Sequence, residues 1–194
     1  MKISRLCTAI ALMLLASPSA AGSFETMSEE EVATYLLFGL DRHAPAPPGL
    51  STFSPSAKPL TVAIAMVEGS QRAEIGRITV ERTGACSFKA ELSDTGALAV
   101  FRAGTFSVDF TALETVETSK TDDAAVTILA GAKMRCLASQ FDGACGRLNS
   151  EDAPRGLWRW KIGPMEKNKS GNLQIDRARL KEAVAYMKGK ICVR

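Results

Sequence analysis

The chain has 194 residues, with 24 basic and 21 acidic side chains and a single histidine. Its formal net charge of +3 is small, so the overall charge gives no argument for binding nucleic acid. A chain of this length suits one ordinary domain, in which roughly 70% of the surface of the unfolded chain becomes buried. We therefore expect a single domain without a nucleic-acid partner.

The first 21 residues have the composition of a secretory signal peptide. Lys2 and Arg5 precede the apolar run 6–16, and small residues then predict cleavage after Ala21. The run is shorter than the about 20 residues of a membrane-spanning helix, and no later segment approaches that length. Cleavage removes two of the 24 basic residues and no acid, which leaves 22 basic and 21 acidic residues. We predict a soluble mature chain, 22–194, that is periplasmic or secreted and has no transmembrane segment.

Four of the five cysteines lie in the mature chain, at Cys86, Cys136, Cys145 and Cys192. An even number in an exported chain predicts two disulfides, for which three pairings exist. Cys136 and Cys145 are close together and flank a turn-like Asp-Gly, so we predict that they pair and that Cys86 pairs with Cys192. The short and long loops would contribute about 2–3 and about 4–5 kcal/mol through the lost entropy of the unfolded chain. A zinc site is the alternative, but the sequence has no CxxC pair.

A short apolar helix is predicted to begin after Ser28. Ser28 and Glu31 form a capping box, and Met27 and Val32 are spaced for a hydrophobic staple. The following segment, 44–59, holds five of the eight prolines. This composition favours an extended, irregular connection over a helix or a strand.

From Leu60 onwards the apolar residues alternate, which predicts about seven antiparallel strands. The clearest case has Cys86, Phe88, Ala90 and Leu92 on one face and polar residues on the other. The predicted strands cover residues 60–68, 74–82, 85–93, 97–102, 105–110, 125–130, 132–139 and 157–163.

The connections between these strands also carry predictions. We expect a short helical turn over Thr111–Glu117, a polar loop over Ser119–Asp123 and a hairpin around Gly131. A polar crossing over Pro164–Asn172 then leads to the final helix.

The final helix, Asp176–Cys192, is amphipathic. Its apolar residues recur at helical spacing and predict one buried stripe, formed by Leu180, Ala183, Val184, Met187 and Ile191. The predicted fold is therefore α+β, with a twisted or partly closed antiparallel sheet, an N-terminal helix and a C-terminal helix packed on the sheet. A pleckstrin-homology-like barrel is one architecture with this order of elements, by analogy alone.

This layout resembles small uncharacterised exported proteins of Gram-negative bacteria. The shared features are the signal peptide, the early helix, a cysteine in a mid-chain strand (Cys86) and a terminal amphipathic helix that ends in a cysteine (Cys192). The resemblance covers most of the mature chain, and it implies no activity for particular residues.

The sequence has no recognisable catalytic or cofactor motif. His43 lies between a predicted helix end and the proline-rich segment, where a positive side chain simply complements the helix dipole. No nucleophile elbow and no phosphate-binding glycine loop occurs, so we expect no cofactor and no metal. Several aspartates lie in predicted turns, where this residue is common for local reasons. They are Asp94, Asp109, Asp122, Asp123, Asp142 and Asp152.

Two surfaces are candidates for binding. On a strand, Trp158 and Trp160 would share one face with Ile162, either inside the core or as an exposed platform. Residues 155–194 hold eleven basic and three acidic residues, whereas residues 24–41 hold five acids and no base. The basic end could face an anionic surface or glycan, or it could match the acidic first helix. The candidate surface consists of Arg159, Lys161, Arg177, Lys181 and Lys188.

The prediction is a disulfide-stabilised binding or accessory module of the bacterial cell envelope, without catalytic activity. The partner would be an envelope protein or an anionic surface or glycan. Two alternatives stay open. One is a hydrolase that uses carboxylates near Asp109 or Asp142. The other is an inhibitor of a secreted enzyme that presents the 136–145 loop as a rigid wedge.

Overall fold

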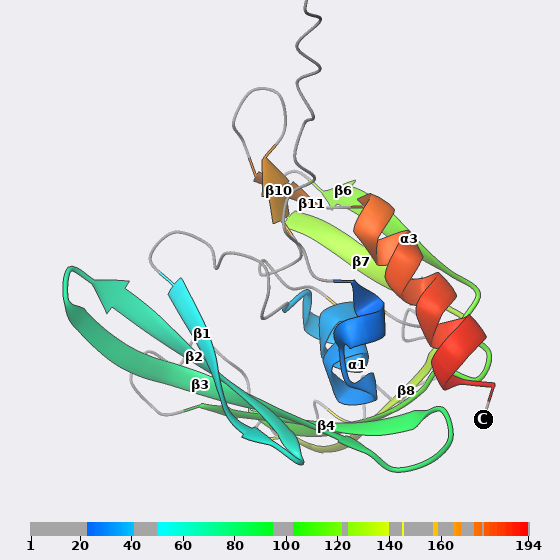
Figure 1. The fold of residues 1–194 in the computed structure, drawn as a ribbon, viewed down its shortest axis with the longest axis horizontal. Helices are drawn as coiled ribbons and strands as arrows, with labels where there is room; N and C mark the ends of the chain where they lie inside the picture. Colours follow the sequence, from blue (N-terminus) through cyan, green and yellow to red (C-terminus); the bar gives the residue numbers. More distant parts are fainter. Residues whose placement is uncertain are drawn as a thin grey trace, which may run out of the picture.

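An open antiparallel sheet of six strands is the largest element of the fold (Figure 1). Its strand order is β1-β2-β3-β4-β5-β8, and every neighbouring pair is antiparallel. The strands are β1 (Leu50–Ala57), β2 (Leu60–Glu68), β3 (Gln71–Arg82), β4 (Ser87–Asp94), β5 (Gly104–Asp109) and β8 (Lys133–Ser139). The computed structural model describes residues 23–40, 50–94, 103–121, 124–139, 145, 157–158, 165–167, 173–175 and 177–193.

Two smaller sheets, two α-helices and two short helical turns complete the described fold. The sheets are β6-β7-β9 and β10-β11, formed by β6 (Thr115–Thr121), β7 (Ala124–Ala130), β9 (Leu157–Trp158), β10 (Met165–Lys167) and β11 (Leu173–Ile175). The helical elements are a 3-10 turn η1 (Phe24–Thr26), α1 (Glu29–Phe38), α3 (Arg177–Tyr186) and a π-helical turn η2 (Met187–Ile191). The α+β class is confirmed. The sheet is open, so a closed pleckstrin-homology-like barrel is wrong for the described residues.

Helix α1 lies at the centre of the core. Its predicted capping box is present, because Glu31 N donates to Ser28 Oγ and Ser28 N donates to Glu31 Oε2. Gly39 ends the helix in the left-handed region at φ 66°. Every residue from Val32 to Phe38 is buried, as expected for a helix that is apolar on all sides. The sequence therefore predicts where the helix begins. The surface of α1 is apolar on all sides because the helix lies at the centre of the core.

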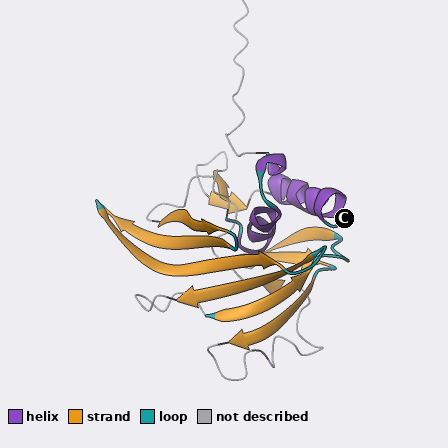
Figure 2. Ribbon diagram, turned by 60° about the horizontal axis from the view of Figure 1, so that its bottom comes forward, coloured by secondary structure: helices purple, strands orange, loops and turns teal. Residues whose placement is uncertain are grey.

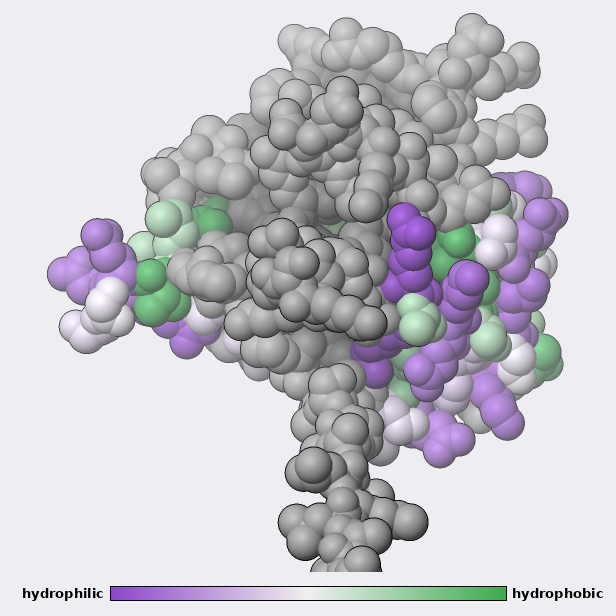
Figure 3. Space-filling model, turned by 90° about the horizontal axis from the view of Figure 1, so that it is seen from above, coloured by the Kyte–Doolittle hydropathy of each residue, from purple (hydrophilic) through white to green (hydrophobic). Residues whose placement is uncertain are grey.

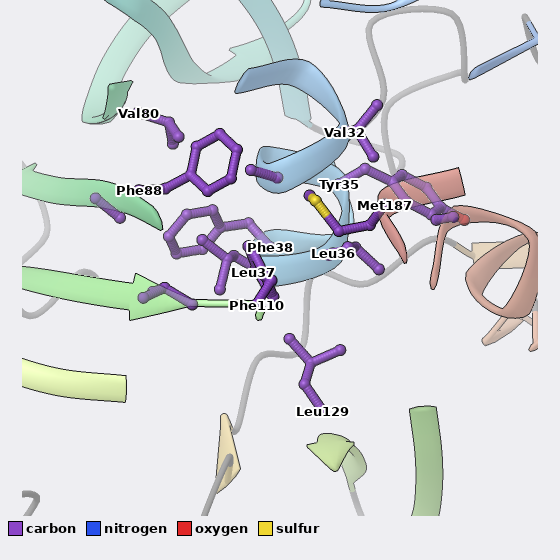
Figure 4. Close-up of a cluster of buried hydrophobic side chains, with 14 of the residues drawn as sticks. Val32, Tyr35, Leu36, Leu37, Phe38, Val80, Phe88, Phe110, Leu129 and Met187 are labelled. Carbon is purple, nitrogen blue, oxygen red and sulfur yellow. The ribbon is translucent and has the colours of Figure 1, made fainter. Parts of the chain in front are cut away.

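Both helices lie on the same side of the large sheet (Figure 2). Phe88 and Phe110 approach α1 from the large sheet, and their ring centroids lie 5.7 Å apart. Met187 approaches α1 from the C-terminal helix, and Leu129 approaches it from β7 (Figure 4). One helix thus connects the large sheet, the β6-β7-β9 sheet and the C-terminal helix into one hydrophobic core.

Strand β4 confirms the alternation that the sequence predicts. Cys86, Phe88, Ala90 and Leu92 are all buried, whereas the intervening side chains are half-buried or exposed. Cys86 itself lies in the bend just before the strand. Strands β2, β3 and β5 also agree with their predicted positions, although β3 begins three residues earlier, at Gln71.

Strand β1 corrects the expectation for the proline-rich segment. Residues 50–57 pair with β2 instead of forming an irregular connection. The pairing register shifts between Phe53 and Ser56, which brackets Pro55. Proline has no N–H to donate, so it is tolerated in an edge strand or at a bulge, and β1 ends the strand order. The prolines exclude a central strand but not an edge strand. Residues 44–49 lie outside the described residues.

Strand β6 replaces the helical turn that we expected over Thr111–Glu117. Leu113 N donates to Phe110 O at 2.9 Å, which closes a tight turn, and Glu114 N then bonds to the β7 end at Ala130 O. Strand β6 continues to Thr121, so much of the expected polar loop 119–123 is also strand. Residues 119–121 of β6 are polar, and a polar stretch has the composition of a loop. We therefore expected a loop where the structure has a strand.

The expected hairpin around Gly131 is wrong, because its two arms belong to different sheets. Strand β7 pairs with β6 and β9, whereas β8 pairs with β5. Gly131 has φ 83°, and a Cβ at this position would overlap the carbonyl of Ala112. Glycine is therefore needed here for a sharp crossing between sheets, and such a crossing has the same local sequence as a hairpin.

Several predictions fall outside the described residues. They include the signal peptide 1–21, the strand 97–102, the first residue of the final helix, Asp176, and the part of strand 157–163 beyond Trp158. The expected polar crossing 164–172 contains the short strand β10 in its described part.

Candidate binding surface on the C-terminal helix

The C-terminal helix presents one buried stripe and one exposed basic flank. The predicted stripe is confirmed, since Leu180, Ala183, Val184, Met187 and Ile191 are between 0% and 6% exposed. Helix α3 contacts α1 and β6, and the π-helical turn η2 contacts α1. Because the apolar face is fully used inside the molecule, the helix can offer only its polar side to a partner.

A disulfide fixes the end of this helix. Cys86 and Cys192 are bonded, with Cα atoms 4.8 Å apart and 106 residues between them in the sequence. Cys192 N donates to Met187 O at 2.9 Å, which closes the π-helical turn immediately before the disulfide. The same turn keeps Met187 and Ile191 buried. Cys136 on β8 is bonded to Cys145, with Cα atoms 5.0 Å apart.

Arg179 fixes the other end of α3 against the N-terminal segment. Its guanidinium lies 4.6 Å from the ring centroid of Phe24 and 5.4 Å from that of Tyr35. Phe24 in turn meets Tyr35 edge-on at 5.3 Å and Tyr186 at 6.3 Å. A cation over two aromatic faces holds α3 against η1 and α1. Arg179 therefore has a structural reason to be basic.

The exposed flank carries three of the five residues of the predicted surface. Arg177, Lys181 and Lys188 are all exposed, and their spacing of i, i+4 and i+11 places them on one side of the helix. We call these three residues the basic stripe. Figure 3 shows hydrophilic side chains interspersed with neutral and apolar ones on the surface of the described part of the molecule. Arg159 and Lys161 lie outside the described residues, so the structure does not join them to the stripe.

Among the described residues, no acid forms an ion pair with Arg177, Lys181 or Lys188. The ion pairs of the described residues include Arg77–Glu74, Arg82–Glu29 and Lys89–Glu91, which lie on other elements. Glu182, the acid within α3, follows Lys181 by one residue and so projects about 100° away around the helix. Lys188 Nζ donates to Glu114 O at 3.1 Å, which links the stripe to the start of β6 and leaves the ammonium further donors.

The position of Arg177 is unfavourable for the helix itself. It occupies the first turn of α3, which contains no acidic residue. The positive end of a helix dipole favours acids there and disfavours bases, typically by 0.3–1 kcal/mol, so about half a kcal/mol is lost at an exposed site. Helix stability therefore does not account for a base at this position, whereas it does account for Lys188 near the negative end.

Among the aspartates considered as catalytic candidates, Asp109 has a structural role. Thr111 donates side-chain and backbone hydrogen bonds to Asp109 that hold its pKa below the ordinary value, and Lys133 adds to this effect. Thr111 N lies 2.8 Å from Asp109 Oδ1, so the carboxylate closes the turn after β5. The side chain of Asp94 is not among those described, and Asp122, Asp123, Asp142 and Asp152 lie outside the described residues, as does His43.

The tryptophan platform remains a prediction. The backbone of Trp158 pairs with Thr127 in β9, but its side chain and all of Trp160 lie outside what the structure describes. Among the described residues, no group of histidine, cysteine, aspartate or glutamate side chains could hold a metal ion. The described helices are all too short or too polar to cross a membrane.

Arg82 contributes to the site in a way that sequence reasoning missed. Its guanidinium pairs with Glu29 in the first turn of α1 and donates to the carbonyls of Gly84 at 2.9 Å and Ala85 at 2.6 Å. This clamp holds the β3–β4 turn, immediately before Cys86, against α1. Glu29 is 53 residues away from Arg82, so no local pattern could have indicated the pair.

The class of protein that these features define is a disulfide-bonded α+β domain with an exposed basic helix. No protein-family model, curated protein or solved structure matches the chain.

Proposed function

We propose that the protein is an exported binding or accessory module of the bacterial cell envelope, and that the basic stripe on α3 and η2 contacts an anionic partner. The observation that carries the proposal is the way α3 is held. The apolar face of α3 and η2 is buried, and Cys192, which follows η2, is bonded to Cys86, so Arg177, Lys181 and Lys188 are displayed on a rigid support. A rigid support lowers the entropy that binding has to overcome.

The two disulfides support export, because such bonds persist in oxidising compartments and are rare in the cytosol. This agrees with the signal peptide expected over 1–21 and with the resemblance to small exported proteins of Gram-negative bacteria. Periplasmic or secreted localisation is tested by fractionating cells that produce the tagged full chain. A processed, oxidised chain in the envelope or medium supports export, and an unprocessed cytosolic chain contradicts it.

Binding is tested by capturing partners from the envelope fraction with the tagged, oxidised protein, at low and at high salt. We expect a discrete partner that is lost at high salt, because exposed charge contacts are screened. The variant R177Q/K181Q/K188Q should lose this partner. The matched control K58Q/R72Q/K89Q removes the same charge from the six-stranded sheet and should retain it. A partner that both variants retain would contradict the proposed surface.

The state of Asp109 does not favour the alternative of a carboxylate-dependent hydrolase. A general acid at neutral pH needs a raised pKa, whereas the pKa of Asp109 is lowered by its bonds with Thr111. The inhibitor alternative depends on the loop between Cys136 and Cys145, of which the structure describes only the ends.

A further inference from the structure

We infer that the ligand of the basic stripe is a linear acidic polysaccharide, a chain with carboxylate, phosphate or sulfate groups along its length. This inference rests on the proposed function and adds the chemical class of the partner. Three observations support it: the shape of the stripe, the lack of apolar anchors beside it and the burial of the apolar face of the helix.

The shape of the stripe suits an extended ligand. At a rise of about 1.5 Å per residue, Lys181 lies about 6 Å along the helix from Arg177, and Lys188 lies about 10 Å further on. The three charges therefore form a row of roughly 16 Å and do not converge on one point. A single phosphate is held by converging donors, whereas a row of cations matches charges that recur along a polymer.

The surroundings of the stripe do not suit a protein partner. Protein interfaces rely on buried aromatic, methionine or arginine anchors, and lysine is depleted in them. Apart from the stripe, the exposed residues of α3 are Ala178, Glu182 and Ala185, and none of them is a large apolar side chain. The large exposed apolar side chains in the described part of the chain are Met66, Val67 and Leu137 in the large sheet and Val193 beyond the helix.

Insertion of the helix into a membrane surface is also disfavoured. An interfacial helix buries its apolar face in the lipid. Here that face, from Leu180 to Ile191, is packed inside the protein, and Cys192 is bonded to Cys86. The helix would have to leave the core to expose an apolar face. Electrostatic contact with a polyanion requires no such rearrangement.

Binding through such a row has a defined salt dependence. Cations that neutralise a polyanion release its counterions, so the logarithm of the affinity falls linearly with the logarithm of the salt concentration. Each stripe residue that is removed should lower this slope by up to about one. The affinity should depend on the charge and length of the polymer and little on its sugar sequence.

The test uses the oxidised protein and two probes, heparin and polygalacturonate, measured by calorimetry from about 50 to about 200 mM salt. We expect both polymers to bind and free galacturonic acid not to bind. R177Q/K181Q/K188Q should weaken polymer binding on the order of tenfold, since exposed charge contacts contribute up to about 1 kcal/mol each. The charge-conserving R177K/K181R/K188R and the control K58Q/R72Q/K89Q should bind as the native chain does. Circular dichroism of each variant establishes that it is folded.

Three outcomes overturn the inference: no binding of either polymer, equal binding by the stripe variant and the native protein, or binding of anionic lipid vesicles without binding of polymers. The proposed function fails separately. A captured envelope protein that the stripe variant loses, together with no polymer binding, would leave the proposed function standing and remove only the polysaccharide.

Discussion

Arg82 shows how one side chain can join elements that are far apart in the sequence. It binds Glu29 on α1 and two carbonyls of the β3–β4 turn, and both partners of the ion pair are only 26% exposed. We expect Arg82→Ala to lower the free energy of unfolding by about 1–2 kcal/mol, because a half-buried pair and two charge-assisted hydrogen bonds are lost.

The matched control for this change is Arg77→Ala. Arg77 pairs with Glu74 three residues earlier at 2.5 Å, but its side chain is 50% exposed. We expect a much smaller change there than for Arg82→Ala, because exposed pairs are screened by solvent. Urea unfolding of both variants measures the difference, and equal effects would show that the Arg82 clamp adds nothing to stability.

Asp109 gives the protein a defined dependence on pH. Its pKa is lowered in the folded state, mainly by the hydrogen bonds from Thr111. A lowered pKa means that the stabilisation is present above the ordinary value of 3.8 and is lost as the pH falls through the folded-state value. We expect Asp109→Asn to be less stable than the native chain at neutral pH and equally stable in strong acid. Urea unfolding between neutral and acidic pH tests this, and a difference that does not change with pH would contradict it.

At the scale of elements, the sequence predicts those whose signals are local. The capping box at Ser28, the alternation from Cys86 to Leu92 and the stripe from Leu180 to Ile191 each follow from residues within a few turns of one another. The exposure of Arg177, Lys181 and Lys188 on α3 and η2 follows in the same way from the position of the buried stripe.

The wrong predictions concern strands whose pairing depends on residues that are distant in the sequence. Strand β1 contains Pro55 and forms only because β2 offers it an edge position. Strands β7 and β8 flank Gly131 like the arms of a hairpin, yet β6 and β5 are their partners. Pairing between strands is a tertiary property, so propensity and turn residues alone could not distinguish these alternatives.

Replacing Gly131 by alanine tests whether the crossing between the sheets needs glycine, and Gly189 is the matched control. We expect Gly131→Ala to cost more than about 2 kcal/mol, because φ is 83° and the new Cβ would overlap Ala112. Gly189→Ala should stabilise the protein by about 0.5–1 kcal/mol, because no atom lies within 4 Å of its new Cβ and alanine favours a helical backbone. Thermal unfolding of both variants is the measurement. A neutral Gly131→Ala would mean that the crossing does not need glycine.

At the scale of the whole molecule, α1 is the element that the other layers share. The large sheet contributes Phe88 and Phe110 to its surroundings, and the C-terminal helix contributes Met187 (Figure 4). A sheet and a helix that both depend on one central helix cannot unfold independently of it. The basic stripe therefore owes its fixed position to the core as a whole as well as to the disulfide at Cys192.

This arrangement predicts a single cooperative unit with one exposed extension. Hydrogen exchange should give α3, β4 and the part of β3 that pairs with β4 the same high free energy of opening, and Leu37→Ala should lower it for all of them by about 2–5 kcal/mol. Residues 66–73, at the end of the β2–β3 hairpin, are all exposed and should exchange faster and respond little to the substitution. Selective loss of protection in α3 alone would contradict the shared core. In that case the stripe would be carried by a separately unfolding helix, and its affinity for a polyanion would vary with the stability of that helix.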